Sequence, residues 1–152
     1  DTSKKAEIAE DKLQVALKQE IAQGLVEVER KDGKVFVTVG SGGAFASGSA
    51  ELTNEAKEIM GKIATVGGGD AGSIIVSGHT DNVPLMFGSP FRDNWDLAAA
   101  RASSVVQAME QSGGTNSEKM KAVSHGEAKP IQSNETAAGR AKNRRIEIEI
   151  QY

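Results

Sequence analysis

The order of strand-like and helix-like segments is the feature that most constrains the fold of this chain. The continuous apolar run Ile74–Val76 predicts a strand that is covered on both faces. Apolar side chains at helical spacing predict a helix that begins at Asp93 or Asn94 and ends near Gln111. A second strand, Met120–Ser124, follows this helix. Strand, helix and strand in this order form a βαβ unit, which predicts an α/β fold with a mixed β-sheet covered by helices.

The remaining segments extend this pattern on both sides of the βαβ unit. The dipeptide Asp32-Gly33 between two alternating stretches predicts a β-hairpin. The other expected elements are a helix over Lys4–Gln23, hairpin strands over Leu25–Arg30 and Lys34–Gly40, a glycine-rich loop over Gly40–Leu52, a helix from Thr53 to about Val66, a long loop over Asp81–Arg92, a short helix over Glu135–Lys142 and a last strand over Arg145–Ile150. The apolar stripe of the first helix is narrow and rich in alanine, so we expect this helix to dock weakly.

The composition narrows the classes of function. The formal net charge of −3 and the pI of about 5.5 argue against a general affinity for nucleic acid, despite the short basic cluster Lys142–Arg145. The absence of cysteine excludes disulfide scaffolds and thiolate metal sites. No apolar run approaches the roughly 20 residues of a membrane span. Because the sequence starts without Met or a signal peptide, we expect it to be a piece of a longer protein.

Polar and charged residues stand where the first strand of the βαβ unit ends. Ligands of open α/β sheets bind beyond the carboxyl ends of strands, and His79, Thr80 and Asp81 lie there. Asp81 could hold an ammonium group, and the guanidinium of Arg101 on the following helix could hold a carboxylate. Together they suit a zwitterionic ligand. Two alternatives remain: Asp81 and Arg101 could pair with each other, or Asp81 could cap a turn.

A metal or hydrolytic site is a further alternative at the same edge of the sheet. His125 follows the next parallel strand, so it could approach His79 and Asp81. A zinc site needs at least three protein ligands, but this spacing matches no metal motif. The sequence also has no Gly-x-Ser-x-Gly elbow and no convincing pair of catalytic carboxylates. We therefore expect no bound metal, no cofactor and no enzymatic activity.

Four segments in a fixed order resemble a known family. They are "GHTDN" at the strand end, "LAAARASSVV" in the helix, "SHGEAKPI" in the next loop and "GRAKNRRIEIEI" in and before the last strand. From about Phe45 to Ile150, the chain is similar to the peptidoglycan-associating domain of the OmpA-like family. The segments "NVPLMFGSPFRDNWDL" and "FASGSAEL" narrow the resemblance to the flagellar motor stator B subunits, the MotB/PomB family, and within it to the sodium-type PomB members. Ala46 departs from the family pattern, because many members carry an acid there.

The resemblance implies an OmpA-like two-layer sandwich with an extra N-terminal helix. Residues 1–24 would form a helix and linker that follow a missing membrane part, and residues 25–152 would form the peptidoglycan-binding domain. The implied function is non-catalytic binding of peptidoglycan, which anchors a sodium-driven stator to the cell wall. The implied ligand is the zwitterionic group of a diaminopimelate-type stem peptide. The residues that the resemblance assigns to peptidoglycan binding are Phe45, Thr80, Asp81, Leu97, Arg101, Arg144 and Arg145.

The resemblance also implies partners and a location. The expected partners are a second copy of the chain in a homodimer, a stator A subunit through the missing membrane region, and periplasmic basal-body ring proteins, but no nucleic acid. The expected location is the periplasm, as part of a single-span inner-membrane protein of a Gram-negative bacterium. The main alternative is an OmpA-like wall-tethering domain of an outer-membrane protein or lipoprotein. An alternative of another class is a small periplasmic hydrolase that uses His79, His125 and Asp81.

Overall fold

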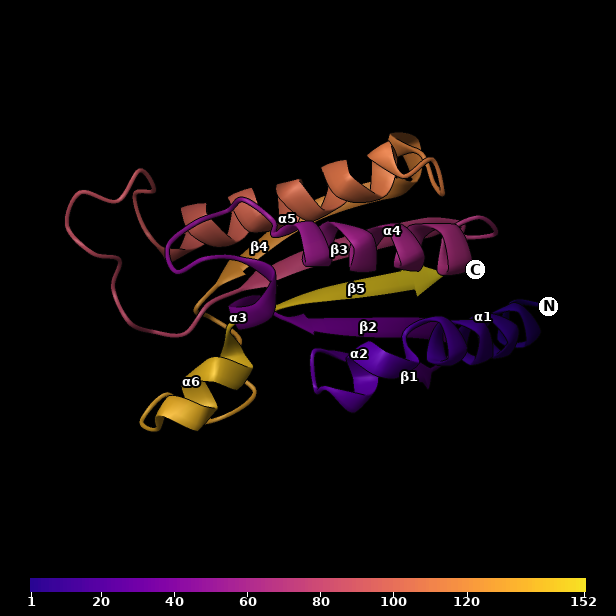
Figure 1. Cartoon of the computed structure of the whole chain (residues 1–152), viewed down its shortest axis with the longest axis horizontal. Helices are drawn as coiled ribbons and strands as arrows, with labels where there is room; N and C mark the ends of the chain where they lie inside the picture. The colour runs from indigo at the N-terminus through magenta and orange to yellow at the C-terminus, as the bar shows by residue number, and fades with distance from the viewer.

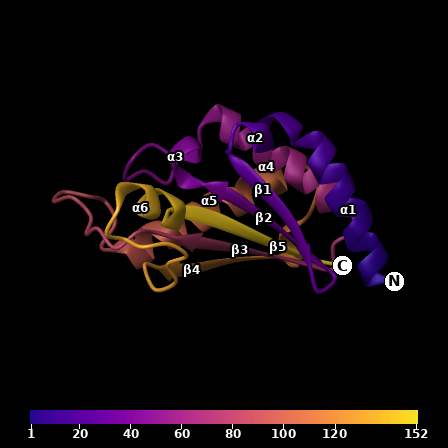
Figure 2. The same cartoon turned by 90° about the horizontal axis from the view of Figure 1, so that it is seen from below.

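The computed structural model describes all 152 residues and forms two layers, a five-stranded mixed sheet with helices over one face (Figures 1 and 2). The strands are β1 Val26–Lys31, β2 Lys34–Gly40, β3 Ser73–His79, β4 Met120–Gly126 and β5 Arg145–Gln151. The helices are α1 Thr2–Ala16, α2 Lys18–Ala22, α3 Ser41–Ala44, α4 Asn54–Gly67, α5 Asn94–Gln111 and α6 Ala137–Asn143, with a 3-10 turn, η1 Ser117–Lys119, before β4. The predicted α/β sandwich with an N-terminal helix is confirmed.

The strands lie in the order β1-β2-β5-β3-β4. β3 and β4 are parallel and are joined by α5, which confirms the predicted βαβ unit. The last strand, β5, lies in the centre of the sheet and is antiparallel to both β2 and β3. The hairpin predicted around Asp32-Gly33 forms β1 and β2. The sheet is therefore mixed, with its two ends made from the first hairpin and from the βαβ unit.

The alternating pattern of β5 explains why this strand can occupy the centre of the sheet. Ile146, Ile148 and Ile150 are fully buried under the helices, whereas Glu147 and Glu149 point to the opposite face. Figure 2 shows that α1, α2, α4 and α5 cover one face of the sheet and that no helix covers the other. The hydrophobic core therefore lies between the sheet and these helices.

The N-terminal segment differs from the predicted single helix over Lys4–Gln23. α1 ends at Ala16, Leu17 adopts φ −107° and ψ 17°, and α2 begins at the next residue. Leu13 and Leu17 are fully buried and belong to the same core cluster as the sheet residues. Two leucines, in addition to the alanine stripe, thus attach this segment to the core. The division of the chain after residue 24 stays a prediction.

The loops that carry the candidate site gather at one end of the molecule. Figure 1 shows the long loop after β3, the turn of α3 and the helix α6 at the end opposite both termini. α3 is a single helical turn, Ser41–Ala44, within the stretch expected to be a glycine-rich loop. None of the helices has both the length and the apolar character needed to cross a bilayer.

Candidate ligand-binding site

The chain leaves β3 through Thr80 and Asp81, which are both buried at the carboxyl end of the strand. The Thr80 N–H donates to a backbone carbonyl at the end of β4 over 2.8 Å, which holds the two strand ends together. The Asp81 Oδ1 accepts a hydrogen bond from the Val83 N–H at 3.0 Å, and Oδ2 accepts one from Arg144 Nη1 at 2.6 Å. Asp81 therefore caps a turn and also forms an ion pair. The partner in this ion pair is Arg144, so the expected alternative of a pair with Arg101 is not formed.

A close approach of α5 to β3 brings Arg101 to the same end of the sheet. Gly78 faces the backbone of α5, and a Cβ atom at position 78 would lie 2.2 Å from the carbonyl oxygen of Ala98. Only glycine fits at such a separation, so Gly78 lets the helix pack directly on the strand. Asp93 caps the start of α5 by accepting from the Asp96 N–H at 2.9 Å. Arg101 follows two turns later and is 5% exposed.

Backbone carbonyls of the loop after α3 hold the guanidinium of Arg101. Nε donates to the carbonyl oxygen of Ser49 at 2.8 Å, and Nη2 donates to that of Ala46 at 3.3 Å. The guanidinium carbon lies 4.8 Å from the centre of the Phe45 ring, which is a cation–π arrangement. Nη1 makes no hydrogen bond within the chain, and it is not among the buried atoms that lack a partner. The fork is thus fixed in orientation and leaves Nη1 without a hydrogen-bond partner in the chain.

The charges of Asp81, Arg101 and Arg144 act on one another. Burial lowers the pKa of Arg101, the positive charge of Arg144 lowers it further, and the negative charge of Asp81 opposes both effects. Arginine stays protonated at neutral pH because its ordinary pKa is far above 7. The three groups together carry one net positive charge. This arrangement favours an anionic group next to the two guanidinium groups and tolerates a cationic group next to the carboxylate.

The two adjacent arginines before and at the start of β5 have different surroundings. Arg144 is the residue next to Asp81, its side chain is 39% exposed, and its backbone carbonyl accepts from the Ser41 N–H at 2.9 Å. Arg145 is 3% exposed and donates from Nε to Glu147 Oε2 at 2.6 Å and from Nη2 to the carbonyl of Lys129 at 3.1 Å. Arg144 is therefore part of the charged cluster. Arg145 braces the loop after β4 and does not contact Asp81.

Two further residues connect α5 with the loop after β3. Leu97 is 5% exposed and lies outside the main core cluster, on the face of α5 that also carries Arg101. Asn94 is 6% exposed, and its Nδ2 donates to the carbonyl oxygens of Asp81 at 3.3 Å and Val83 at 3.1 Å. From the sequence, Asn94 is one of two candidates for the start of the helix, and Asp93 is the residue that caps it. The side-chain amide of Asn94 at the start of a helix was the only sequence signal that it could hold the backbone of the loop after β3.

The long loop between Asp81 and α5 leaves apolar side chains in solvent. Phe87 is fully exposed, Met86 is 86% exposed, and Trp95 at the start of α5 is half-exposed. The Trp95 ring lies against the backbone of Gly126, where an added Cβ would be 2.9 Å from the ring. A hollow of about 380 Å³ lies between this loop, the start of α5 and Glu127. Asn94 lines this hollow and donates to the carbonyl oxygen of Asp81, whereas the side chains of Asp81, Arg101 and Arg144 do not line it.

The two histidines considered as metal ligands or catalytic groups stack on each other. The ring centres of His79 and His125 are 4.8 Å apart with an interplanar angle of 19°. His79 is 3% exposed and neither of its ring nitrogens makes a hydrogen bond, although Nε2 lies 3.5 Å from Glu147 Oε1. Contact with His79 and the bond from Arg145 lower the pKa of Glu147 to about 2, against the opposing effect of burial. Nowhere in the structure do three side chains of His, Asp or Glu come close enough together to hold a metal ion.

The fold is an α/β domain whose charged cluster lies beyond the carboxyl end of β3, where ligands of open α/β sheets bind. Comparison with known families identifies the domain more closely. Residues 44–144 match the OmpA family. The chain belongs to the OmpA family, and this match covers α4, the whole βαβ unit, α6 and Arg144, and begins at the last residue of α3.

Similar proteins include motility proteins and a cell wall anchor. Motility protein B of Bacillus subtilis is 36% identical over 120 residues, which are 76% of this chain and 44% of that protein. The cell wall anchor of the T6SS from Pseudomonas aeruginosa has a TM-score of 0.81 at 31% identity, covering 91% of this chain and 96% of that one. The periplasmic domain of Helicobacter pylori MotB has a TM-score of 0.74 at 27% identity, covering 83% and 81%.

These similarities confirm the predicted resemblance to the MotB family. The chain spans less than half the length of the Bacillus subtilis relative. The finer resemblance to sodium-type members stays a prediction, as do the roles assigned to the site residues.

Proposed function

We propose that this chain is a non-catalytic peptidoglycan-binding domain that anchors a flagellar motor stator to the cell wall. The observation that carries the proposal is the buried carboxylate of Asp81, which pairs with Arg144 and lies within electrostatic reach of Arg101; both guanidinium groups keep unused donors. This is the charge pattern that a zwitterionic ligand requires. Diaminopimelate-type stem peptides of peptidoglycan present such a group.

The chemistry of binding follows from the remaining hydrogen-bonding capacity of each group. Each oxygen of Asp81 has accepted one hydrogen bond from the chain and has a second lone pair for an ammonium group. Nη1 of Arg101 can donate to the ligand carboxylate without giving up either backbone carbonyl. Arg144 is exposed enough to add a second donor. The ligand would bring no net charge, so it would leave the single positive charge of the cluster unchanged.

The similar proteins support the assembly that we propose. One is named motility protein B, one is the periplasmic domain of MotB, and one is a cell wall anchor. We therefore place this domain in the periplasm, as part of an inner-membrane stator subunit that pairs with a second copy, with a stator A subunit and with basal-body ring proteins. The long loop after Asp81 favours the stator over an ordinary wall tether, and we propose sodium as the coupling ion from the same resemblance.

Arg101 gives the most direct test of peptidoglycan binding. Arg101→Ala should weaken co-sedimentation with isolated sacculi at least about 10-fold, because a charge-assisted hydrogen bond contributes roughly 1.5–3 kcal/mol. Arg101→Lys keeps the charge but loses the fork, so it should also weaken binding while leaving circular dichroism unchanged. Arg30→Ala is the matched control, since Arg30 forms an exposed ion pair with Glu10 beside the hairpin turn, at the end of the sheet opposite the charged cluster. Equal binding by the parent, by folded Arg101→Ala and by the control would reject the proposal.

A second candidate differs only in the machine that the domain anchors. The T6SS wall anchor is matched over 96% of its length, which favours a secretion system as an alternative to a flagellar stator. Replacement of the corresponding domain in a motility protein B with this chain separates the two. Motility in soft agar that depends on Arg101 would support the stator. Sacculus binding without motility would favour the secretion machine.

A further inference from the structure

The uncovered face of the sheet carries a cluster of charged and titratable side chains where the strands end. His79 of β3 and His125 of β4 stack there, with ring centres 4.8 Å apart. Arg145 and Glu147 of β5 lie beside His79 and are joined by a hydrogen bond of 2.6 Å. No helix covers this face (Figure 2). The cluster is therefore separate from the hydrophobic core, and the proposed contacts to peptidoglycan use neither histidine.

The stack buries His79 without giving its ring a hydrogen bond. His79 is 3% exposed, and neither ring nitrogen has a partner. Glu147 Oε1 lies 3.5 Å from Nε2, while the other oxygen of this carboxylate accepts from Arg145. A buried polar group without a partner is destabilising, because it has lost its hydrogen bonds to water. Opening the stack would return water to the His79 ring, so opening costs less than the loss of the stacking contact alone.

Positive charges around His125 oppose its protonation. Burial lowers the pKa of His125, and His79, Lys129 and Arg145 lower it further, whereas Glu147 acts in the opposite direction. These groups come from β3, β5 and the loop after β4. His125 is therefore neutral at neutral pH, and a proton taken up below about pH 6.5 adds a positive charge next to Arg145 and Lys129. Turning the His125 ring toward solvent relieves this repulsion.

The main chain connects the stacked rings to the ligand site. The register of β3 and β4 shifts at His79, which pairs with Gly126 and leaves His125 as an extra residue of β4. Such irregularities are common next to active sites, where they redirect a side chain or end the pairing. The Gly126 carbonyl accepts the 2.8 Å hydrogen bond from the Thr80 N–H, and Asp81 is the next residue. His125 is therefore one residue away from the hydrogen bond that holds the Asp81 end of β3.

We propose that the stacked pair of His79 and His125 positions Asp81 for the ligand and makes binding sensitive to pH. At neutral pH the closed stack holds the ends of β3 and β4 together. In acid, the protonated His125 turns outward, Gly126 follows, and Thr80 and Asp81 lose the support of β4. This inference rests on the peptidoglycan binding proposed above and adds a condition under which that binding weakens.

Co-sedimentation with sacculi at about pH 7.5 and about pH 5.5 tests the effect on binding. His125→Phe keeps an aromatic ring on His79 but takes up no proton. Between these pH values the parent should lose about 3- to 10-fold more affinity than His125→Phe, because uptake of one opposed proton changes affinity by up to about 10-fold per pH unit. The carboxylates of the sacculi and of the site are the same in both proteins, so the difference belongs to His125. Circular dichroism checks the fold, and His125→Gln is a second neutral variant that avoids the larger ring.

Trp95 reports the same movement without any ligand. It is the only tryptophan of the chain, it is half-exposed, and its ring lies against Gly126. Release of Gly126 in acid should uncover the buried side of this ring. Quenching of Trp95 fluorescence by acrylamide, a neutral molecule, should therefore increase in the parent as the pH falls below about 6.5. In His125→Phe the quenching should stay constant over the same range.

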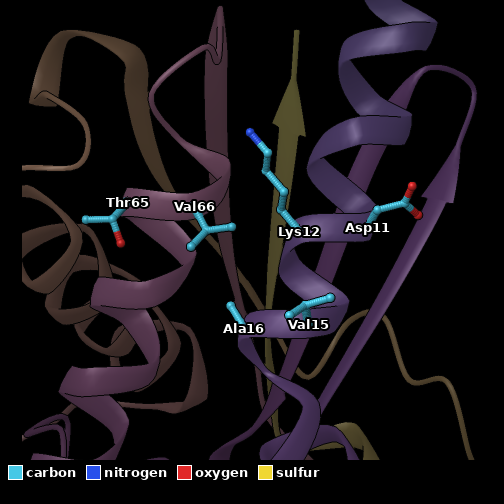
Figure 3. Close-up of a pocket in the computed structure, with 6 residues that line it drawn as sticks. All are labelled: Asp11, Lys12, Val15, Ala16, Thr65 and Val66. Atoms are coloured by element: carbon cyan, nitrogen blue, oxygen red, sulfur yellow. The ribbon is translucent and has the colours of Figure 1, made fainter.

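Lys129 supplies a test of the electrostatic origin. Lys129→Gln removes a positive charge that faces His125 and keeps the backbone carbonyl that accepts from Arg145. The midpoint of the quenching titration should therefore move to higher pH. Lys12→Gln is the matched control and should leave the midpoint unchanged, because Lys12 is exposed on α1, at the far end of the molecule from the stacked rings. Figure 3 shows Lys12 among the residues that line a groove of about 580 Å³ between α1 and α4.

Equal losses of binding in acid by the parent and by folded His125→Phe would overturn the proposal, as would a quenching profile that His125→Phe leaves unchanged. A midpoint that Lys129→Gln does not move would contradict the role of positive charge in opening the stack. A parent that fails to bind sacculi at about pH 7.5 would count against the proposed function instead. The quenching titration uses no sacculi, so it would still show whether the histidine pair controls the end of β3.

Discussion

The ion pair between Asp81 and Arg144 could stabilise the fold or hold the ligand. These two roles can be separated, because they predict different losses in the free energy of unfolding and in the affinity for sacculi. Asp81→Asn keeps an oxygen that can accept from the Val83 N–H and removes only the negative charge. Arg144→Gln removes the guanidinium but keeps a polar side chain. Because the Arg144 side chain is 39% exposed, solvent screens the pair despite its 2.6 Å contact. We therefore expect a coupling of only about 0.5–1 kcal/mol in the free energy of unfolding.

Ligand binding should respond more strongly than stability to the same substitution. Without the charge of Asp81, an ammonium group of the ligand loses a charge-assisted hydrogen bond worth about 1.5–3 kcal/mol, or at least about 10-fold in affinity. Arg144→Gln should weaken binding less, because Arg101 keeps its free donor. The double variant should bind no better than Asp81→Asn. The assay is a double-mutant cycle, with urea unfolding and co-sedimentation with sacculi measured on the same four proteins.

Two results would refute this reasoning. If Asp81→Asn remains folded and binds sacculi like the parent, Asp81 does not hold the ligand. If the coupling in unfolding exceeds about 3 kcal/mol while binding falls only where the protein unfolds, the pair is a structural one.

Three further substitutions or conditions test the fold beneath the site. Gly78→Ala should destabilise the protein by about 3 kcal/mol or more in urea unfolding and should weaken sacculus binding, because the added Cβ would lie 2.2 Å from the backbone of α5. Gly42→Ala is the control and should change neither, because an added Cβ there has open space. The free energy of unfolding should decrease as the pH is lowered below about 6.5. Burial lowers the pKa of His125 in the folded chain, so the unfolded chain takes up this proton first. The free energy of unfolding should fall further between the ordinary pKa of Glu147, 4.5, and its folded value of about 2, and less so in Glu147→Gln. Leu13→Ala should cost about 2–5 kcal/mol if α1 is part of the cooperative core, and a change under about 1 kcal/mol in urea unfolding would show that α1 docks weakly.

The βαβ unit could be predicted because its signals are local. An apolar run gives β3, a helical stripe gives α5, and the strand-end rule then places Thr80 and Asp81 at the edge where ligands bind. Arg101 entered through the resemblance as much as through its position on the helix. The lack of similar local signals explains why the central position of β5 was not predicted, since an alternating strand can pair at an edge or in the middle of a sheet.

The contacts within the site could not be predicted for a different reason. Asp81 pairs with Arg144, which is 63 positions away in the sequence. From the sequence alone, the neighbouring Arg145 was an equally good candidate for this partner. Only the strand register decides between them, because Arg145 is in β5 opposite His79 whereas Arg144 precedes the strand. The partners of Arg101 are backbone carbonyls, which every residue carries, so no sequence pattern marks Ala46 or Ser49.

Arg101 and Arg144 differ in burial and in their hydrogen bonds, and this difference suggests how such a site would hold a ligand. Arg101 is buried and bound by two carbonyls over the Phe45 ring, so its free nitrogen keeps one direction and loses little freedom on binding. Arg144 makes one side-chain ion pair and its side chain is 39% exposed, so in the proposed site it could turn from Asp81 toward a ligand carboxylate at small cost. The carboxylate released by that motion is the one that would receive the ligand's ammonium group. In the proposed site, the resting ion pair would therefore compensate a buried charge in the absence of ligand, and Asp81 would exchange Arg144 for the ammonium group when the ligand binds.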